Sequence, residues 1–321
     1  MNIYWSNLKL FRECPKKYLW SKGHPEIDLG AGMGKPFPIP EEQKESEHHK
    51  LMGSVLSRVV EEIYNNKLWA KKTLTQDALR IASATFHELE LSHYCDWSLL
   101  PRQEALDTVL NGTRNYIKAM WSNNLLGDLC ESEWKFSKKL ETSAGVIGFC
   151  GYADLIIRKD DPVTGKSHVM IMDGKNAGTP GKYEDPDQLI WYALCMRLQY
   201  GETPDELGFI YFRFAPDSPP PSWDEAKDGK WTGIHFVEWD KDADLKRMGL
   251  EAINTKIAID NKAFEATPSP KTCEKCPFEY TCTERQEQKK ANAAKRGMGA
   301  RRESTTKIVI DTPDDGGFFE L

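Results

Sequence analysis

The sequence predicts a mixed α/β fold (α+β) in which a mixed β-sheet is flanked by helices. Three observations predict it. Apolar residues recur at helical spacing from about residue 47 to 125, strand-like runs separated by turn residues fill 131–175, and a helix at 187–199 precedes an extended run at 207–215. Helices, then an antiparallel hairpin, then a helix and a strand are typical of helices packed on a mixed sheet.

Composition places the chain among soluble globular proteins. Its 321 residues are 40% hydrophobic and 29% charged, and no stretch approaches the roughly 18 consecutive apolar residues of a membrane span. The first 20 residues lack the blocks of a signal peptide, so we expect a cytoplasmic protein of a bacterial or virus-infected cell. In that reducing compartment, the eight cysteines favour metal or cluster ligation over disulfides.

The first strong helix is expected to begin near residue 47. Residues 24–46 are rich in Pro, Gly and charged residues and read as a loop. After them Leu56, Val59, Val60 and Ile63 fall on one face at helical spacing.

A β-hairpin follows, with strands at 147–158 and 167–175 joined by "KDDPVTGK". If its register is symmetric about Val163 and Thr164, paired residue numbers sum to about 327, and Asp154 faces Asp173. Alternation then puts Lys175 on the same face as Asp173. A one-residue bulge would break this inference.

Two opposed carboxylates repel each other unless a cation or a shared proton lies between them. Hard divalent ions such as Mg²⁺ bind a few carboxylates and keep several waters, so the pattern indicates a metal site with an adjoining Lys. The alternative is that both Asp residues are solvated strand ends. On the next helix, Gln188 and Tyr192 lie at i and i+4, within reach of each other, although Tyr192 also reads as a core aromatic.

These residues lie in three short motifs, "GYAD" at 151–154, "DGK" at 173–175 and "QLIWY" at 188–192. Their order and spacing resemble the PD-(D/E)xK nuclease superfamily in its RecB-like branch. The resemblance implies a restriction-endonuclease-like core. The family's earlier motif has a Gly followed four residues later by His, whereas "GSVLS" here has Gly53 and then Ser57. His48 and His49 lie nearby and read as a solvated helix start.

The resemblance implies a Mg²⁺- or Mn²⁺-dependent deoxyribonuclease site. Asp154, Asp173 and the backbone carbonyl of Gly174 would bind the metal, and Lys175 would orient or activate water. Gln188 and Tyr192 would position Lys175 or the DNA backbone. Glu133 is a further acidic candidate, with a solvated strand residue as the alternative.

The cysteines form a second pattern. Cys273, Cys276 and Cys282 are spaced C-x2-C-x5-C, and Cys14 lies near the other terminus. Four thiolates suit Zn²⁺ or an iron–sulfur cluster. One Cys before the core and three after it resemble the [4Fe-4S] nucleases of the AddB type and the CRISPR-associated exonucleases. The resemblance implies a [4Fe-4S] cluster that ties the two ends of the chain together; zinc and unligated thiols are the alternatives.

Contacts to DNA are expected from basic and aromatic residues. Lys16, Lys17 and Tyr18 lie beside Cys14, and residues 285–302 carry many Lys and Arg. The alternative is a solvated helix and tail. The acidic and aromatic end, "DDGGFFEL", resembles peptide tips that recruit partners, so a recombination or replication protein is a candidate partner alongside single-stranded DNA or duplex ends.

We therefore expect five segments: an N-terminal segment with the first cluster Cys (1–46), a helical region (47–130), a nuclease core (131–265), a cluster-binding segment (266–284) and a flexible tail (285–321). The leading hypothesis is an exonuclease acting in recombination, repair or viral replication. A catalytically weakened nuclease fold that serves as a DNA-binding or assembly subunit is the second, and a zinc-stabilised structural protein the third.

Overall fold

The computed structural model describes residues 1–22, 46–127, 130–160, 165–177, 184–220, 231–274 and 276–304, with side chains up to residue 294. The chain divides into two compact units. The first comprises Met1–Lys9 and Phe37–Lys262, and the second comprises Leu10–Pro36 and Ala263–Leu321. None of the described helices is both long and apolar enough to cross a membrane.

The first unit is built on a mixed β-sheet with the strand order β1-β3-β4-β5-β6, and β2 pairs with β3 beside this path. Neighbours β2–β3, β3–β4 and β5–β6 are antiparallel, whereas β1–β3 and β4–β5 are parallel. The strands are β1 (Asn2–Ile3), β2 (Cys130–Thr142), β3 (Gly145–Asp160), β4 (Ser167–Lys175), β5 (Glu206–Tyr211) and β6 (Ile234–Phe236).

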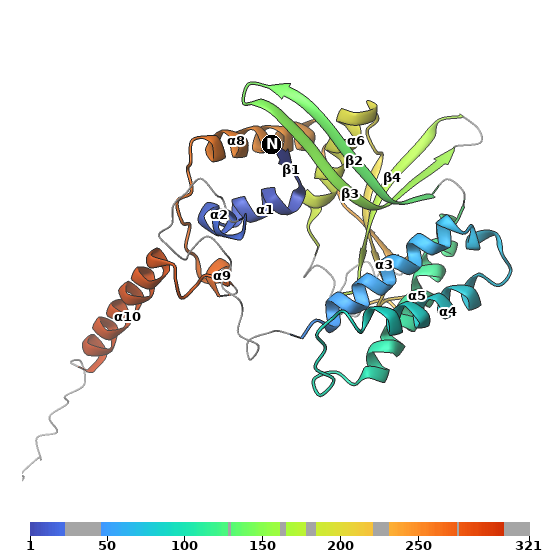
Figure 1. Ribbon diagram of the computed structural model, residues 1–321, viewed down its shortest axis with the longest axis horizontal. Coiled ribbons are helices and arrows are strands. Elements are labelled where there is room, and N and C mark those ends of the chain that lie inside the picture. Colours follow the sequence, from blue (N-terminus) through green and yellow to red (C-terminus); the bar gives the residue numbers. More distant parts are fainter. Residues whose placement is uncertain are drawn as a thin grey trace, which may run out of the picture. The chain divides into compact units, whose positions relative to one another are not determined.

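Helices cover both faces of this sheet (Figure 1). On one face lie α3 (His48–Asn65), the short 3₁₀ helix η2 (Leu68–Ala70), α4 (Leu74–Leu89) and α5 (Arg102–Ser122). On the other lie α6 (Pro186–Tyr200), α8 (Lys241–Asp260) and the start of α1 (Trp5–Glu13). The expected mixed sheet flanked by helices is confirmed.

The burial and the two ends of helix α6 follow from its sequence. Its segment from Leu189 to Met196 is buried without interruption, because the helix packs against the sheet on one side and α8 on the other. Pro186 occupies its first turn, where no backbone N–H is needed. Gly201, with φ of +74°, ends it in the left-handed conformation that glycine adopts at low cost.

The hairpin register predicted from the sequence is confirmed over the paired residues. The pairs run from Leu155 with Met172 to Asp160 with Ser167, and each pair sums to the same number. Val169 and Ile171 share the core beneath α6, as alternation requires. Asp154, in the second half of β3, therefore lies beside the end of β4.

Strand β3 reverses its faces at Asp154. Phe149 and Ala153 point into the core beneath α6, as residues of equal parity should. Beyond Asp154 the odd-numbered residues lie on the opposite face of the sheet. Leu155 packs in the core beneath α3–α5, whereas the even-numbered Ile156 packs in the core beneath α6.

Strand β2 makes the matching reversal at Glu133. Cys130 packs in the core beneath α3–α5, whereas Phe136, of the same parity, packs in the core beneath α6. Glu133 has φ of +51°, a left-handed conformation that side chains other than Gly rarely adopt. The backbone therefore twists at the point where Glu133 lies next to Asp154, between the flanking paired positions.

The second unit holds the end of α1, α2 (Pro15–Lys22), α9 (Pro270–Cys273) and α10 (Thr283–Ser304). Its small core consists of Leu19, Trp20, Phe278 and Cys282, with Cys276 packed against it. Residues 285–304 of the expected tail belong to α10, and the terminal "DDGGFFEL" lies outside the described residues.

Candidate functional site

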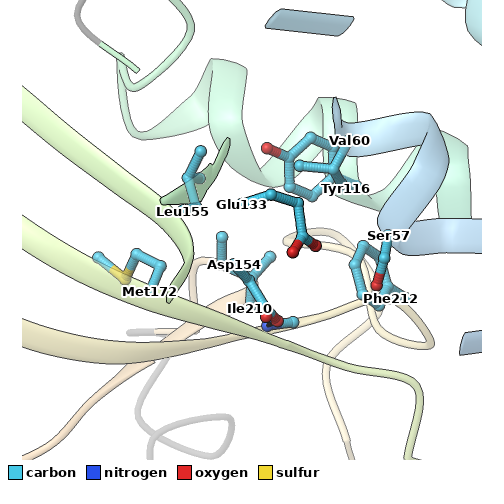
Figure 2. Close-up of a pocket in the computed structure, with 10 residues that line it drawn as sticks. Ser57, Val60, Tyr116, Glu133, Asp154, Leu155, Met172, Ile210 and Phe212 are labelled. Atoms are coloured by element: carbon cyan, nitrogen blue, oxygen red, sulfur yellow. Dashed lines mark hydrogen bonds between the residues drawn. The ribbon is translucent and has the colours of Figure 1, made fainter. Parts of the chain in front are cut away.

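A pocket of about 300 Å³ lies where α3 and α5 approach the ends of the central strands. Polar side chains reach it from α3 (Ser57), β2 (Glu133) and β3 (Asp154), and Gly174 of β4 lines it through its backbone. Figure 2 shows the carboxylates of Glu133 and Asp154 and the hydroxyl of Ser57 turned into the same space.

Asp154 is held in place by the neighbouring strand. Its Oδ2 accepts a hydrogen bond from the backbone N–H of Gly174 at 2.9 Å. Burial and the nearby charge of Asp173 raise the pKa of Asp154, because both disfavour its ionised form. The carboxyl is thus oriented but in need of a compensating cation.

Gly174 is required for this close approach. A β-carbon at this position would lie 2.7 and 2.8 Å from two ring carbons of Phe212, closer than real contacts allow. The absence of a side chain lets the Phe212 ring cover the strand end while the Gly174 N–H still reaches Asp154.

Asp173 and Lys175 form an ion pair at the end of β4. Asp173 is only 3% exposed, and Lys175 Nζ lies 2.5 Å from its Oδ2. Burial raises the pKa of Asp173, although the charge of Lys175 and its hydrogen bond act in the opposite direction. Lys175 Nζ also lies 5.2 Å from the ring centroid of Phe209, which limits where the ammonium can move.

Gln188 and Tyr192 meet on α6 as their spacing predicts. Gln188 Nε2 donates to the Tyr192 hydroxyl at 3.0 Å. Tyr192 is 8% exposed, and burial, together with the charges of Asp173 and Asp154, raises its pKa. The hydroxyl therefore stays protonated near both carboxylates.

Ser57 is exposed on α3 at the position where the motif has His. Next to it, partial desolvation and the charge of Glu61 raise the pKa of Glu133. His48 is 6% exposed and its Nδ1 lies 2.6 Å from Ser46 Oγ, so the expectation of a solvated His48 was wrong: its imidazole packs against Trp97.

The apolar wall of the pocket was missed in the sequence. It consists of Val60, Tyr116, Leu155, Met172, Ile210 and Phe212. Tyr116 lies on α5, in a segment that matched no motif, and hydrogen bonds with the Tyr64 hydroxyl at 2.8 Å. Val60 had been placed on the apolar face of the first helix, and the helical spacing of Val109, Thr113 and Tyr116 was a signal for Tyr116.

The second unit brings the four predicted cysteines to one cavity, which Cys14, Cys273, Cys276 and Cys282 all line. All four are free thiols. Burial raises the pKa of Cys276 and of Cys282. Within the described ranges, no three or more His, Cys, Asp or Glu side chains are arranged so that they could hold a metal ion.

The expected DNA contacts beside Cys14 have other partners. Lys16 Nζ lies 2.7 Å from Glu284 and Lys17 Nζ lies 2.9 Å from Glu13. Tyr18 is 5% exposed and packs edge-on against Phe11, with ring centroids 5.5 Å apart. Because a buried ring cannot stack on bases, Tyr18 belongs to the core of the second unit and the expectation of a DNA contact is withdrawn.

A family model described as the PD-(D/E)XK nuclease superfamily matches residues 5–283. No curated protein matches the chain. A solved structure titled "Crystal structure of SSO0001" is 15% identical to this chain, covering 73% of it and 84% of that structure's chain, with a TM-score of 0.29, which is too low to support an inference.

Proposed function

The chain belongs to the PD-(D/E)XK nuclease superfamily, and from this premise we propose that it is a metal-dependent deoxyribonuclease that hydrolyses phosphodiester bonds. The observation that carries the proposal is the meeting of motif residues from the interior of β3 and the end of β4. Asp154 accepts a hydrogen bond from the N–H of Gly174, which lies between Asp173 and Lys175 in the chain. Lys175 pairs with Asp173, and the charges of both carboxylates raise the pKa of Tyr192. A protein that only bound DNA would have no use for buried carboxylates beside a lysine.

The donor set fits a hard divalent ion. Asp154, Asp173 and the backbone carbonyl of Gly174 offer oxygen ligands, and burial raises the pKa of both carboxyls, so a bound cation would stabilise their ionised forms. Mg²⁺ or Mn²⁺ bound there would supply charge stabilisation for the phosphate and the leaving oxygen.

The protein's own groups account for the rest of the chemistry. Lys175, fixed by Asp173 and by the Phe209 ring, would hold the attacking water by hydrogen bonding. Asp154 is kept in one orientation by the Gly174 N–H. The Gln188–Tyr192 pair would position Lys175 or a backbone phosphate rather than exchange protons, since the pKa of Tyr192 is raised.

Cleavage assays test the proposal. Labelled linear duplex and single-stranded DNA should be shortened in the presence of Mn²⁺ or Mg²⁺ and left intact in EDTA. Absence of cleavage with either metal would instead favour the second candidate, a weakened nuclease fold that binds or assembles on DNA, which the exposed Ser57 at the motif's His position suggests.

We assign to Glu133 the part that the motif gives to His. Its carboxylate shares the pocket with Asp154 and Ser57 (Figure 2), and the left-handed backbone at Glu133 lies where β2 reverses its faces. Because no three carboxylates of the described residues are arranged around one ion, Glu133 would act as an outer ligand, through a bound water, in place of the imidazole from α3. This supports an active rather than a weakened site.

Complementation tests the assignment of Glu133. Glu133→Gln should weaken Mn²⁺ binding, measured by calorimetry, by about tenfold or more, since outer and inner ligands each contribute on this scale. The matched control is Glu131→Gln, in the same strand but paired with Arg158 at 2.7 Å. Adding Ser57→His to Glu133→Gln should restore binding; if Glu133→Gln binds Mn²⁺ as the parent does, Glu133 is no ligand.

For the second unit we propose a [4Fe-4S] cluster held by Cys14, Cys273, Cys276 and Cys282. The support for this proposal is that all four cysteines line one cavity, although their side chains are not arranged as a metal-holding group in this structure. Zn²⁺ is the alternative. Anaerobically purified protein should contain about four irons and show broad visible absorbance; a colourless protein with one zinc would select the alternative.

The substrate is proposed to be DNA ends or single strands in recombination, repair or viral replication, which makes the enzyme an exonuclease. Basic residues support a phosphate polymer as substrate, and Lys289 and Lys290 of α10 are among those with described side chains. Closed circular DNA should then resist cleavage under conditions that degrade the linear form, whereas nicking of the circle would indicate an endonuclease. A partner recruited by the terminal peptide is proposed from the sequence alone.

A further inference from the structure

One face of the β2–β3 hairpin is open to solvent along β2 and at Tyr152. In β2 every second side chain from Glu133 to Glu141 is exposed, whereas the buried Phe136 lies on the opposite face, beneath α6. In β3, Tyr152 is paired with Lys135 and is 45% exposed. Figure 1 shows the turn end of this hairpin lying away from α3. The sheet therefore presents an uncovered face between the pocket and the turn.

This open face is continuous with the pocket. Asp154 and Leu155 both line the pocket, so the reversal of β3 lies between them and leaves Tyr152 on the same face as Asp154. In β2, Lys135 shares a face with Glu133 by the same alternation. Side chains two residues apart lie about 7 Å from each other along a strand. A DNA strand with one phosphate at Asp154 would therefore have its neighbouring nucleotide within reach of Tyr152.

The Tyr152 ring has a face available for stacking. Lys135 Nζ lies 5.8 Å from its ring centroid, and no other aromatic ring of the described residues packs against it. Tyr200, which is similarly exposed at 46%, differs because its ring packs against Trp134 and Phe136, with centroids 6.0 and 6.4 Å apart. Exposure of Tyr152 is thus not compensated by packing on a neighbouring ring.

The charges on this face favour a phosphate polymer. Among the described residues, neither Lys135 nor Lys139 pairs with a carboxylate, whereas Lys118 and Lys241 each pair with an Asp at 3.0 and 2.9 Å. Glu141 contributes the acidic side chain nearest the turn. Unpaired ammonium groups beside an exposed ring are the combination that binds the backbone and the bases of a single strand.

We infer that this face binds an unpaired DNA strand leading out of the pocket, with one base stacked on the Tyr152 ring and phosphates held by Lys135 and Lys139. The inference rests on the proposed nuclease function and adds to it the form of the substrate beside the scissile phosphate. A base that is stacked within a duplex has no free face for the ring, so Tyr152 favours single strands and frayed ends. Tyr152 binds substrate and takes no part in bond cleavage.

Binding of DNA by the full-length protein tests the part of Tyr152. Fluorescence anisotropy with a labelled single-stranded oligonucleotide is measured in EDTA, which prevents metal-dependent cleavage. Tyr152→Leu should weaken binding about tenfold, the scale of one lost base–ring stack, while Tyr152→Phe should bind as wild type does. The control is Tyr94→Leu, which removes a ring that is 53% exposed and lines neither pocket. A folded Tyr152→Leu protein with wild-type affinity would overturn the inference.

The salt dependence of the same binding tests the lysines. Lys135→Gln and Lys139→Gln should each reduce the slope of log affinity against log salt by about 0.7, the value for one phosphate contact on a single strand. Lys138→Gln removes the same charge from the same strand, but Lys138 pairs with Phe149 on the opposite face, so its slope should stay as in wild type. Equal slopes for all three variants would contradict the phosphate contacts.

Photocrosslinking tests the stack without a variant. Wild type irradiated with a single strand that contains 5-iododeoxyuridine should form a crosslink that mass spectrometry assigns to Tyr152. Crosslinks confined to other peptides would overturn the inference and leave the nuclease proposal intact. Wild type that binds no DNA at all would instead contradict the proposed function, so the two failures are distinguishable.

Discussion

Gly174 sets the geometry of the pocket at the level of a single residue. Gly174→Ala should destabilise the protein by about 1–3 kcal/mol, because its β-carbon would collide with the Phe212 ring and displace the N–H that holds Asp154. Thermal or chemical unfolding measures the change. Gly53→Ala is the control: nothing lies within 4 Å of its added β-carbon, so this helical substitution should stabilise α3 by up to about 1 kcal/mol. Equal effects of the two substitutions would contradict the proposed role of Gly174.

The raised pKa of Asp154 predicts how metal binding depends on pH. A metal ion binds the carboxylate, so a carboxyl that holds its proton to higher pH must release it on binding. Mn²⁺ affinity should therefore increase as pH rises, and calorimetry in buffers of different ionisation heat should detect proton release. Affinity that is independent of pH would show that Asp154 is already ionised.

Stability of the metal-free protein should have the opposite dependence. Above the ordinary Asp range the unfolded chain ionises Asp154 while the fold resists ionisation, so stability falls as pH rises towards the raised value. Mn²⁺ should therefore increase the unfolding temperature more at higher pH. An unfolding temperature that Mn²⁺ raises equally at every pH would contradict this coupling.

At the scale of elements, the reversal of faces in β2 and β3 explains how Glu133, on a strand that pairs only with β3, reaches the pocket. A non-glycine residue with φ of +51° costs roughly 1–2 kcal/mol relative to an ordinary conformation. The fold therefore maintains Glu133 at a cost in stability, which accords with the functional part that we propose for it.

Substitution by glycine separates the two roles of Glu133. Glu133→Gly should leave the metal-free protein as stable as wild type or up to about 1 kcal/mol more stable, because glycine accepts positive φ, while Mn²⁺ binding is weakened. Denaturant unfolding and calorimetry measure the two quantities. Glu131→Gly, at an ordinary strand position paired with Arg158, should destabilise the protein. If Glu133→Gly is destabilised as much as Glu131→Gly, the strained backbone at Glu133 is not what the substitution changes.

These strands also show what the sequence could and could not predict. The register of β3 with β4 was predictable because the turn is symmetric and two short apolar runs lie at equal distances on either side of it. The reversal at Glu133 and Asp154 was not predictable. "ESEWKF" begins with three polar residues that do not show which face Glu133 takes, and packing against the helices on the two faces of the sheet decides it. Tyr18 and His48 were misjudged for the same reason: a polar sequence neighbourhood does not report burial.

At the scale of the whole molecule, the four cysteines come from segments far apart in sequence. A group that joined Cys14 to Cys273 would close a loop of roughly 260 residues, which by analogy with disulfides restricts the unfolded chain by about 5 kcal/mol. Cys14→Ser should therefore reduce the folded yield and the unfolding temperature of the iron-loaded protein. Cys95→Ser, which alters a cysteine outside the cavity, is the control. A Cys14→Ser protein that is as stable as wild type would contradict a structural cluster.

Whether the protein is a nuclease depends on the ion pair at the end of β4. The most direct measurement is Mn²⁺-dependent cleavage of end-labelled linear DNA by wild type, Asp173→Ala and Lys175→Ala. Controls are Lys118→Ala and Asp217→Ala, which alter another Asp–Lys pair, exposed and 3.0 Å apart. Wild type and both controls should cleave at similar rates, while Asp173→Ala and Lys175→Ala should lose activity by at least about 100-fold, the scale of a lost catalytic group. Cleavage that survives both Asp173→Ala and Lys175→Ala would contradict the assigned site.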